Sequence, residues 1–166
     1  MAHVLIAGTT MSGKSTLARQ LAAQYKRAGI GVIVLDPLQD DRWGADYQTA
    51  DNGAFLASAK NSWQCALFVD EAGAAIGRYN PEMEWCVTQG RHLGHRTHVI
   101  TQWPTQLSPL VRGQCAYLYL FQVPRKAAAL LAEEFNSEQL EAAAALPMGE
   151  CLEMQRGGAV RRHKVF

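Results

Sequence analysis

The sequence lacks several features that would each indicate a class of protein. No run of apolar residues approaches the eighteen or more of a membrane-spanning helix, and no secretory signal precedes the first apolar run. The four cysteines, at positions 65, 86, 115 and 151, include no C-x-x-C pair and so favour reduced thiols over a disulfide framework. The formal net charge is only +1, so the composition alone does not indicate a nucleic-acid partner. We therefore expect a soluble intracellular protein with no transmembrane segment.

The chain contains enough apolar sequence for one well-packed domain. It has 166 residues, of which 48% are apolar and 19% charged, so we expect a single domain over residues 1–166. Apolar runs typical of buried strands alternate with helix-forming segments, which predicts an α/β fold with a mainly parallel sheet covered on both faces. The predicted strands cover residues 4–7, 31–35, 65–69, 98–102 and 116–121. The predicted helices cover residues 14–28, 51–60, 80–92, 125–135 and 137–145.

Local signals set the ends of some of these segments. Asp51 is a suitable N-cap for the helix that it precedes, and Asn136 for the helix over residues 137–145. A Gly-Gly pair at 157–158 separates residues 149–155 from residues 159–166, which predicts a C-terminal hairpin. Residues 39–52 are polar and aperiodic, so we interpret them as a loop.

The most specific motif follows the first apolar run. Residues 8–15 fit the pattern G-x-x-x-x-G-K-[ST], with a strand before them and a helix-forming segment after them. Such a loop binds phosphate, because its glycines permit close approach of the backbone and its amides form an anion nest at a helix N-terminus. The alternative interpretation is an ordinary glycine turn. The residues expected to bind the nucleotide are Gly8, Thr9, Thr10, Met11, Ser12, Gly13, Lys14, Ser15 and Thr16.

The chemistry expected at this loop depends on charged and polar side chains. Lys14 can reach the outer phosphates, and Ser15 is expected to bind Mg²⁺. Asp70 ends an apolar strand, where its carboxylate would lie at the carboxyl edge of the sheet and hold the Mg²⁺ water shell beside Ser15. Glu71 can polarise the water that attacks the γ-phosphate, as a general base. The two acids can also be a solvated pair at a strand end. The pattern favours ATP hydrolysis, with ATP and Mg²⁺ as ligands.

The order of these motifs resembles the catalytic-glutamate branch of the P-loop ATPases. The resemblance implies a RecA-like three-layer sandwich, in which the strand after Asp70 and Glu71 inserts beside the P-loop strand. It also implies a polar sensor at the end of that inserted strand, here Thr101 or Gln102. We favour Gln102, because its amide can both donate to the γ-phosphate and accept from the attacking water.

A narrower resemblance is carried by residues 90–104, which contain an Arg-x-x-Gly run, a strand, Thr-Gln and x-Pro. This arrangement resembles the FtsK–HerA superfamily of DNA-pumping ATPases, as do the Asp-Pro pair at 36–37 and residues 146–150. The similarity extends from residue 4 to about residue 155. So short a chain, without the appended domains of chromosome translocases, is most similar to the genome-packaging ATPases of tailless, membrane-containing viruses, the tectivirus-like type.

This resemblance implies a motor that hydrolyses ATP and moves double-stranded DNA into a viral capsid. Its partners would be DNA, capsid or portal-vertex proteins, and further copies of the chain in a ring that we expect to be hexameric. It would act in the cytoplasm of the host cell and at the packaging vertex of the virion. Zonula occludens toxin-like assembly proteins of filamentous phages share the Asp-Glu-Ala and Arg-His-x-Gly runs, and they remain an alternative. A small-molecule kinase and a non-hydrolysing switch are the others.

Ring ATPases of this type complete each site with an arginine from the neighbouring subunit. Arg91 matches the superfamily's arginine and is our first choice, followed by Arg112 and Arg96. Each of them can equally be a surface or helix-end cation.

Other residues are assigned on weaker grounds. The three histidines at 92, 95 and 98 straddle a predicted helix end and a strand start, so a subunit contact or a phosphate-facing loop is favoured over a metal site. Loops 40–50 and 73–80 are expected pore elements. The cations that can face a DNA backbone, or can equally be solvated at the end of a hairpin, are Arg156, Arg161, Arg162 and Lys164.

Overall fold

The computed structural model describes residues 2–77 and 80–166. Within them, eight strands form one sheet in the order β3-β2-β4-β5-β1-β6-β7-β8. Neighbours from β3 to β6 are parallel, and the β6–β7 and β7–β8 pairs are antiparallel, which confirms the mainly parallel sheet and the C-terminal hairpin. The strands are β1 (His3–Ala7), β2 (Val32–Leu35), β3 (Tyr47–Thr49), β4 (Ala66–Val69), β5 (Arg96–Thr101), β6 (Cys115–Leu120), β7 (Glu150–Gln155) and β8 (Arg161–Lys164).

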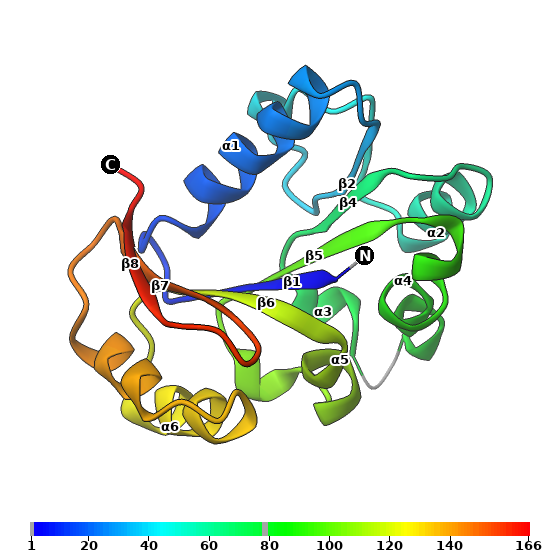
Figure 1. The fold of residues 1–166 in the computed structure, drawn as a ribbon. Helices are drawn as coiled ribbons and strands as arrows, with labels where there is room; N and C mark the ends of the chain where they lie inside the picture. The colour runs from blue at the N-terminus through cyan, green and yellow to red at the C-terminus, as the bar shows by residue number, and fades with distance from the viewer. Residues whose placement is uncertain (1, 78–79) are drawn as a thin grey trace.

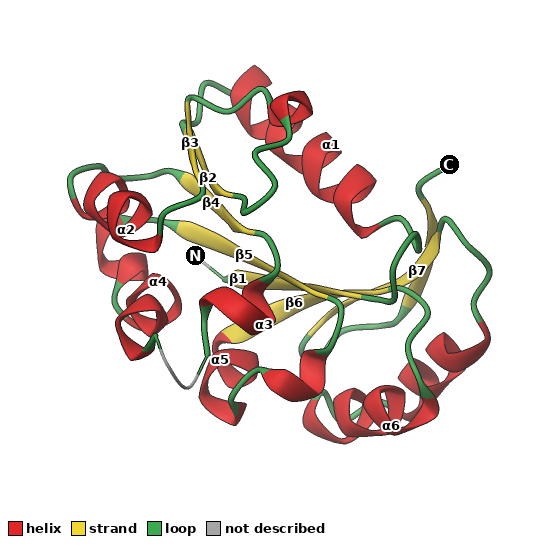
Figure 2. Cartoon of the chain, turned by 180° about the vertical axis from the view of Figure 1, so that it is seen from behind, coloured by secondary structure: helices red, strands yellow, loops and turns green. Residues whose placement is uncertain are grey.

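Helices cover both faces of this sheet, so the predicted three-layer α/β sandwich is confirmed (Figures 1 and 2). One face packs against α1, and the other packs against α2 to α6. The helices are α1 (Lys14–Arg27), α2 (Asn52–Lys60), α3 (Ala72–Ala75), α4 (Trp85–Thr88), α5 (Pro109–Gln114) and α6 (Arg125–Glu134). Short 3-10 helices supplement them at Asp41–Trp43, Pro81–Glu84, Gly90–Leu93, Pro104–Gln106 and Glu138–Ala145.

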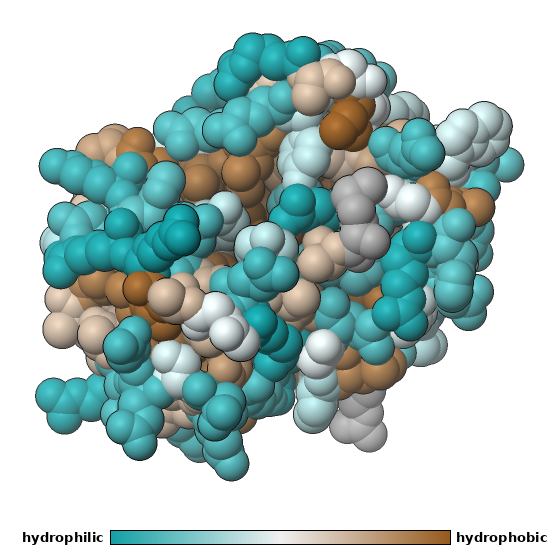
Figure 3. All heavy atoms as spheres, viewed as in Figure 1, coloured by the Kyte–Doolittle hydropathy of each residue, from teal (hydrophilic) through white to brown (hydrophobic). Residues whose placement is uncertain are grey.

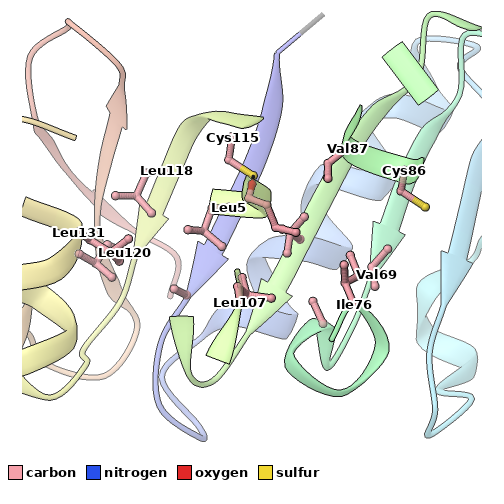
Figure 4. Close-up of a cluster of buried hydrophobic side chains, with 14 of the residues drawn as sticks. Leu5, Val69, Ile76, Cys86, Val87, Leu107, Cys115, Leu118, Leu120 and Leu131 are labelled. Atoms are coloured by element: carbon pink, nitrogen blue, oxygen red, sulfur yellow. Dashed lines mark hydrogen bonds between the residues drawn. The ribbon is translucent and has the colours of Figure 1, made fainter. Parts of the chain in front are cut away.

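Two hydrophobic clusters fill the spaces between the layers. Because successive strand side chains point to opposite faces, Val4 and Ile6 of β1 pack toward α1, whereas Leu5 packs toward the other helices. Figure 4 shows the second cluster, in which Leu118 of β6 and Leu131 of α6 lie among other buried side chains. The central strands are therefore buried on both faces, which explains why they read as continuous apolar runs in the sequence.

The position of β5 matters most for the site. β5 lies between β4 and β1, as the resemblance to the catalytic-glutamate branch implied. Because all three strands are parallel, their carboxyl ends meet at the same edge of the sheet. The loop after β1, the residues after β4 and the residue after β5 are thereby brought together.

Some boundaries differ from the prediction. Residues 39–52 were expected to be a loop, but Tyr47–Thr49 forms the edge strand β3 beside β2, and three residues are too few to show periodicity. The helix expected over 80–92 is divided between two 3-10 segments and α4, where Gly90 has low helix propensity. The Asp51 cap is confirmed, because its carboxylate accepts from the amide of Ala54.

Asn136 does not open a helix, as had been expected. It has a φ of 54° and follows α6, where its amide bonds to the carbonyl of Glu133 and the next amide bonds to the carbonyl of Ala132. This is the Schellman pattern, in which a left-handed residue closes a helix, and asparagine tolerates that conformation better than most residues. The segment Glu138–Ala145 that follows is a 3-10 helix.

Candidate nucleotide-binding and catalytic site

The loop after β1 is held between the neighbouring strands. The amide of Gly8 bonds to the carbonyl of Thr101 at the end of β5, and the amide of Thr9 bonds to the carbonyl of Gln122 after β6. α1 then begins at Lys14. The structure therefore brings residues 8–16 into a strand, loop and helix arrangement, with the helix N-terminus facing the loop as phosphate binding requires.

The two glycines of the motif occupy positions where a larger residue does not fit. A Cβ at Gly8 would lie 2.5 Å from the Phe121 Cβ and 2.6 Å from the Ser12 hydroxyl oxygen. Gly13 has a φ of +116°, and a Cβ there would lie 2.8 Å from the Phe121 ring. The loop is thus a cradle of bare backbone, which leaves its amides accessible to an anion.

Two polar side chains of the loop suit a phosphate ligand. The Lys14 ammonium donates to the carbonyl of Thr9 at 2.9 Å, which holds the positive charge over the loop. Burial lowers the pKa of Lys14, and the carboxylates of Glu71 and Asp70 partly counter this effect. The buried Ser12 hydroxyl has no hydrogen-bond partner among the described residues. A phosphate oxygen would satisfy it.

The two consecutive acids follow β4 directly. Asp70 is largely enclosed, and burial raises its pKa to about 6, with further raising by Asp36 and Glu71 and lowering by the Glu71 amide and Lys14. The amide of Glu71 donates to the Asp70 carboxylate at 2.9 Å. Glu71 itself has φ 50° and ψ 44°, a left-handed conformation that costs a non-glycine residue about 1 kcal/mol. The sharp turn at Glu71 ends the alternation of the strand and leaves the Glu71 side chain exposed.

Gln102 is tied to the phosphate-binding loop. Its amide nitrogen donates to the Thr10 hydroxyl at 2.6 Å. Thr101, the other polar residue at this strand end, instead accepts from the amide of Trp103 and is buried. The structure therefore distinguishes the two, because only the Gln102 side chain among them reaches the loop.

The oxygen donors of the site fit a hard cation. The Ser15 hydroxyl and the Asp70 carboxylate are the ligand types that Mg²⁺ prefers, and Mg²⁺ retains several waters and takes other ligands from substrate phosphates. The described residues contain no group of three or more histidine, cysteine or acidic side chains that could enclose a metal ion. Ser15 and Asp70 would hold Mg²⁺ together with the phosphates of a bound nucleotide.

Asp36 is a residue at this edge whose role was missed from the sequence. Its carboxylate is buried and accepts from the amides of Leu38 and Asp40 and from the Trp43 indole nitrogen. These bonds fix the turn after β2 next to the end of β4. An Asp-Pro pair after an apolar strand was visible in the sequence, but the distant Trp43 partner was not.

The three candidate arginines differ in availability. Arg91 is exposed in the Gly90–Leu93 turn and makes one long contact, 3.4 Å, to the Gln114 side chain. Arg112 is buried, pairs with the Glu134 carboxylate, and donates to the carbonyls of Pro104 and Leu107. With its donors so occupied, Arg112 does not suit a role in a neighbouring site, contrary to its place among our candidates.

Arg96 and Arg91 lie at the amino end of β5, the opposite end from Gln102. The Arg96 guanidinium stacks over the Tyr117 ring at 4.9 Å and is half-buried. Arg91 is therefore the most accessible of the three. A strand of this length spans about 20 Å, so neither residue can serve the nucleotide of its own chain.

The histidines were expected to face a subunit contact or a phosphate, and two of them do not. His95 is buried, accepting from the Cys65 amide and donating to the Ala59 carbonyl. His98 is buried between the Leu67 carbonyl and the Tyr25 hydroxyl. His95 lies in the buried turn before β5, and His98 is buried because β5 runs in the centre of the sheet between β4 and β1.

The four cations expected to face DNA also differ in their surroundings. Arg156 donates to the carbonyls of Cys115, Glu134 and Arg112 and lies over the Phe135 ring, so it is a structural residue. The other three cations of that group are exposed on β8.

Two remaining features concern the expected pore loop and the membrane. In the expected pore loop 73–80, residues 78 and 79 lie outside the described part of the chain. Every helix in the described residues falls short of the length and apolarity needed to span a bilayer.

The fold is that of a P-loop NTPase, with a mainly parallel sheet and the catalytic-glutamate strand order. Similar solved structures carry the same fold. The genome packaging NTPase B204 from Sulfolobus turreted icosahedral virus 2, in complex with AMPPCP, has a TM-score of 0.82 and 21% identity, over 98% of this chain and 96% of that chain. B204, the DNA-packaging ATPase from Sulfolobus turreted icosahedral virus, has a TM-score of 0.79 and 19% identity, over 98% and 97%.

A third solved structure with the same fold is that of a protein named VirB4. VirB4 of Thermoanaerobacter pseudethanolicus has a TM-score of 0.73 and 12% identity, over 98% of this chain and 88% of that chain. No protein-family model and no curated protein sequence matches this chain. At these identities the structural likeness establishes the fold.

Proposed function

We propose that this protein is an ATP-hydrolysing motor that moves double-stranded DNA during the packaging of a viral genome, with residues 1–166 as its ATPase domain. One observation carries the proposal: β5 lies between β4 and β1, which brings Glu71 and Gln102 to the edge where Lys14 and the P-loop lie. That combination suits water as the acceptor of the γ-phosphate. The names of the B204 neighbours support packaging as the process.

The residues divide the work of hydrolysis. The loop amides and Lys14 bind the β- and γ-phosphates, and Ser15 and Asp70 hold Mg²⁺, which neutralises charge on those phosphates when bound. Gln102 orients the attacking water, and Glu71 takes its proton. The water oxygen forms a bond to the γ-phosphorus as the bond to the bridging oxygen breaks, and ADP leaves with the electron pair.

Arg91 completes the site of a neighbouring copy in a ring, which we expect to be hexameric. Its exposure at the amino end of β5, remote from its own P-loop, supports a role in trans. The exposed cations of β8 contact the DNA backbone without reading sequence. The capsid or its portal vertex is the docking partner, and the motor acts in the host cytoplasm and at the virion vertex.

The test is the steady-state rate of Mg·ATP hydrolysis across protein concentration, with and without double-stranded DNA, at low and moderate salt. We expect the rate per subunit to rise with concentration and with DNA, and the DNA effect to weaken with salt. A rate that neither variable changes would contradict the ring motor and favour a protein-partnered assembly ATPase. Phosphorylation of a small acceptor would indicate a kinase.

Mixing two inactive variants tests the arginine directly. Arg91→Ala retains an intact P-loop, and Lys14→Ala retains Arg91, so each should be inactive alone while their mixture recovers part of the wild-type rate. Arg161→Ala removes an exposed arginine of β8 and should leave ATP hydrolysis without DNA unchanged. Failure of the mixture to recover activity would contradict the role of Arg91 in trans.

A further inference from the structure

A small cavity adjoins the P-loop on the side away from the catalytic carboxylates. Its volume is about 290 Å³. One wall is backbone and polar side chain from Gly13, Lys14, Ser15 and Thr16, and the rest is formed by Met11, Met148 and Phe166. The proposed hydrolysis does not use the side chain of any of the last three residues.

The sheet order places this cavity and the hydrolytic groups on opposite sides of the P-loop. β5 and β4, which carry Gln102 and Asp70, lie on one side of β1, whereas β6, β7 and β8 lie on the other. Met148 precedes β7 and Phe166 follows β8. In Figures 1 and 2 the chain after β8 runs beside the beginning of α1. A nucleotide whose γ-phosphate faced Glu71 would therefore extend its other end toward the cavity.

The apolar side chains at the cavity are unusually exposed. Phe166 is 57% exposed, Met11 75% and Met148 61%, and they are three of the eight large hydrophobic side chains that are exposed in the described residues. Three such side chains around one cavity form an exposed apolar patch, and exposed apolar patches are typical of binding sites. A flat apolar ligand would bury them.

Backbone hydrogen bonds connect the chain segments that carry Met148 and Phe166 to the P-loop. The amide of Gly149 bonds to the Ser12 carbonyl at 2.9 Å, and the amide of Val165 bonds to the Gly149 carbonyl at 2.8 Å. Gly149 has a φ of +83°, and a Cβ there would lie 2.8 Å from the Phe166 ring. The Phe166 ring thus rests on bare backbone next to the loop, in place before a ligand arrives.

We propose that this cavity binds the purine base of the nucleotide, which stacks on Phe166 and contacts the thioethers of Met11 and Met148. The inference rests on the proposed function and adds its base specificity. Stacking is stronger for purines than for pyrimidines, and the polar groups of the cavity, Lys14, Ser15 and Thr16, serve the phosphates. Adenine and guanine nucleotides therefore bind about equally, and cytosine nucleotides bind more weakly.

The experiment is calorimetric titration of the wild type and of Phe166→Ala with Mg²⁺ complexes of the β,γ-methylene analogues of ATP, GTP and CTP, and of tripolyphosphate. Loss of a base–aromatic stack weakens binding by about five- to 150-fold, so we expect a loss in that range for both purine analogues in Phe166→Ala. Tripolyphosphate, which has no base, should bind both proteins equally. Phe166→Tyr retains the ring and should remain within about twofold of the wild type.

A matched control is Trp63→Ala, which removes an exposed aromatic side chain outside the cavity and should change none of these affinities. Equal weakening of tripolyphosphate in Phe166→Ala would assign Phe166 to support of the loop and overturn the inference. Unchanged affinity for the ATP analogue, or equal wild-type affinity for the CTP analogue, would overturn it as well. A wild type that binds neither tripolyphosphate nor any nucleotide would overturn the proposed function itself.

Discussion

Titratable side chains lie both at the carboxyl edge of the parallel strands and in the amino half of the sheet. Their surroundings differ between the two regions. At the carboxyl edge, Asp70 and Glu71 lie beside each other, with Asp36 and Lys14 close enough to shift the Asp70 pKa. In the amino half, His98 stacks on Phe68 with ring centroids 4.2 Å apart and hydrogen-bonds through both ring nitrogens.

The surroundings of His98 are largely apolar. Figure 3 shows hydrophobic residues gathered between α1 and the sheet, where a cavity of about 360 Å³ reaches His98 and Tyr25.

The two surroundings distinguish side chains expected to act in catalysis from side chains that stabilise the fold. Burial, with the like charges of Asp36 and Glu71, raises the Asp70 pKa, and Glu71 has a left-handed backbone, so this edge lowers stability while favouring a cation and a polyphosphate. In the amino half, burial lowers the pKa of His98 and both of its ring nitrogens are hydrogen-bonded, so this residue contributes to folding alone. Variants at the first edge should change turnover, and variants at the second should change stability.

The largest effect is expected for Glu71→Gln, which keeps the shape of the side chain and removes the base. We expect kcat to fall by about 10²–10⁴-fold, the usual contribution of a general base. ATP binding and the free energy of unfolding should stay near the wild-type values. Single-turnover hydrolysis, nucleotide titration and urea unfolding measure the three quantities. Retained turnover would remove Glu71 as the base, and a large loss of stability would break the comparison.

His98→Gln should have the reverse profile. The variant loses a buried stacked ring and imperfectly replaces two hydrogen bonds, which should cost about 2–3 kcal/mol of unfolding free energy. The rate of ATP hydrolysis per folded molecule should be unchanged. His92→Gln alters an exposed histidine and should affect neither quantity. A drop in kcat for His98→Gln at full folding would show that the two halves are coupled.

The stability of the wild type should also depend on pH. Burial lowers the pKa of His98 from 6.5 to about 3, with help from the nearby charges of Arg96 and His3, while the Tyr25 hydroxyl faces its ring. Below about pH 6.5 the unfolded chain therefore binds a proton that the folded chain does not. The unfolding free energy should fall by about 1.4 kcal/mol per pH unit for this histidine, until the pH reaches the folded-state pKa.

Urea unfolding at several pH values between 7.5 and 4.5 measures this slope. His98→Gln should have a shallower slope than the wild type over the same range. Burial also lowers the pKa of His3, to about 4, and this residue should account for part of the slope that remains. Identical slopes in the two proteins would contradict the assignment to His98.

Gln102→Ala should have the smallest effect of the series. Removing one neutral amide that orients water, and that bonds to Thr10, should reduce kcat by about tenfold, with little change in stability. Gln102→Glu is a useful companion, because it keeps the length of the side chain but adds a negative charge next to the phosphates. Rates of Gln102→Ala equal to the wild type would assign the sensor to another residue.

The sequence was sufficient for the layers of the fold and for placing the P-loop, Asp70, Glu71 and Gln102 at the carboxyl edge, but not for the role of Asp36 there. Continuous apolar runs and the spacing of the P-loop, Asp70 and Gln102 are local signals, and the strand order follows from the resemblance. Arg112 was misjudged because its partner Glu134 lies 22 positions away, and no local pattern indicates that pairing. The cavity wall at Phe166 was missed for the same reason, since it meets the P-loop only after the hairpin has folded back.

The outer strands of the sheet have a consequence for how copies of this chain behave at high concentration. In the described residues the sheet ends at β3, which has only three residues, and at β8, which carries the exposed cations Arg161, Arg162 and Lys164. An open strand edge is a template for joining sheets between molecules, and short length and repeated positive charge both disfavour that pairing. Crowded copies are therefore protected from irreversible aggregation through their sheets.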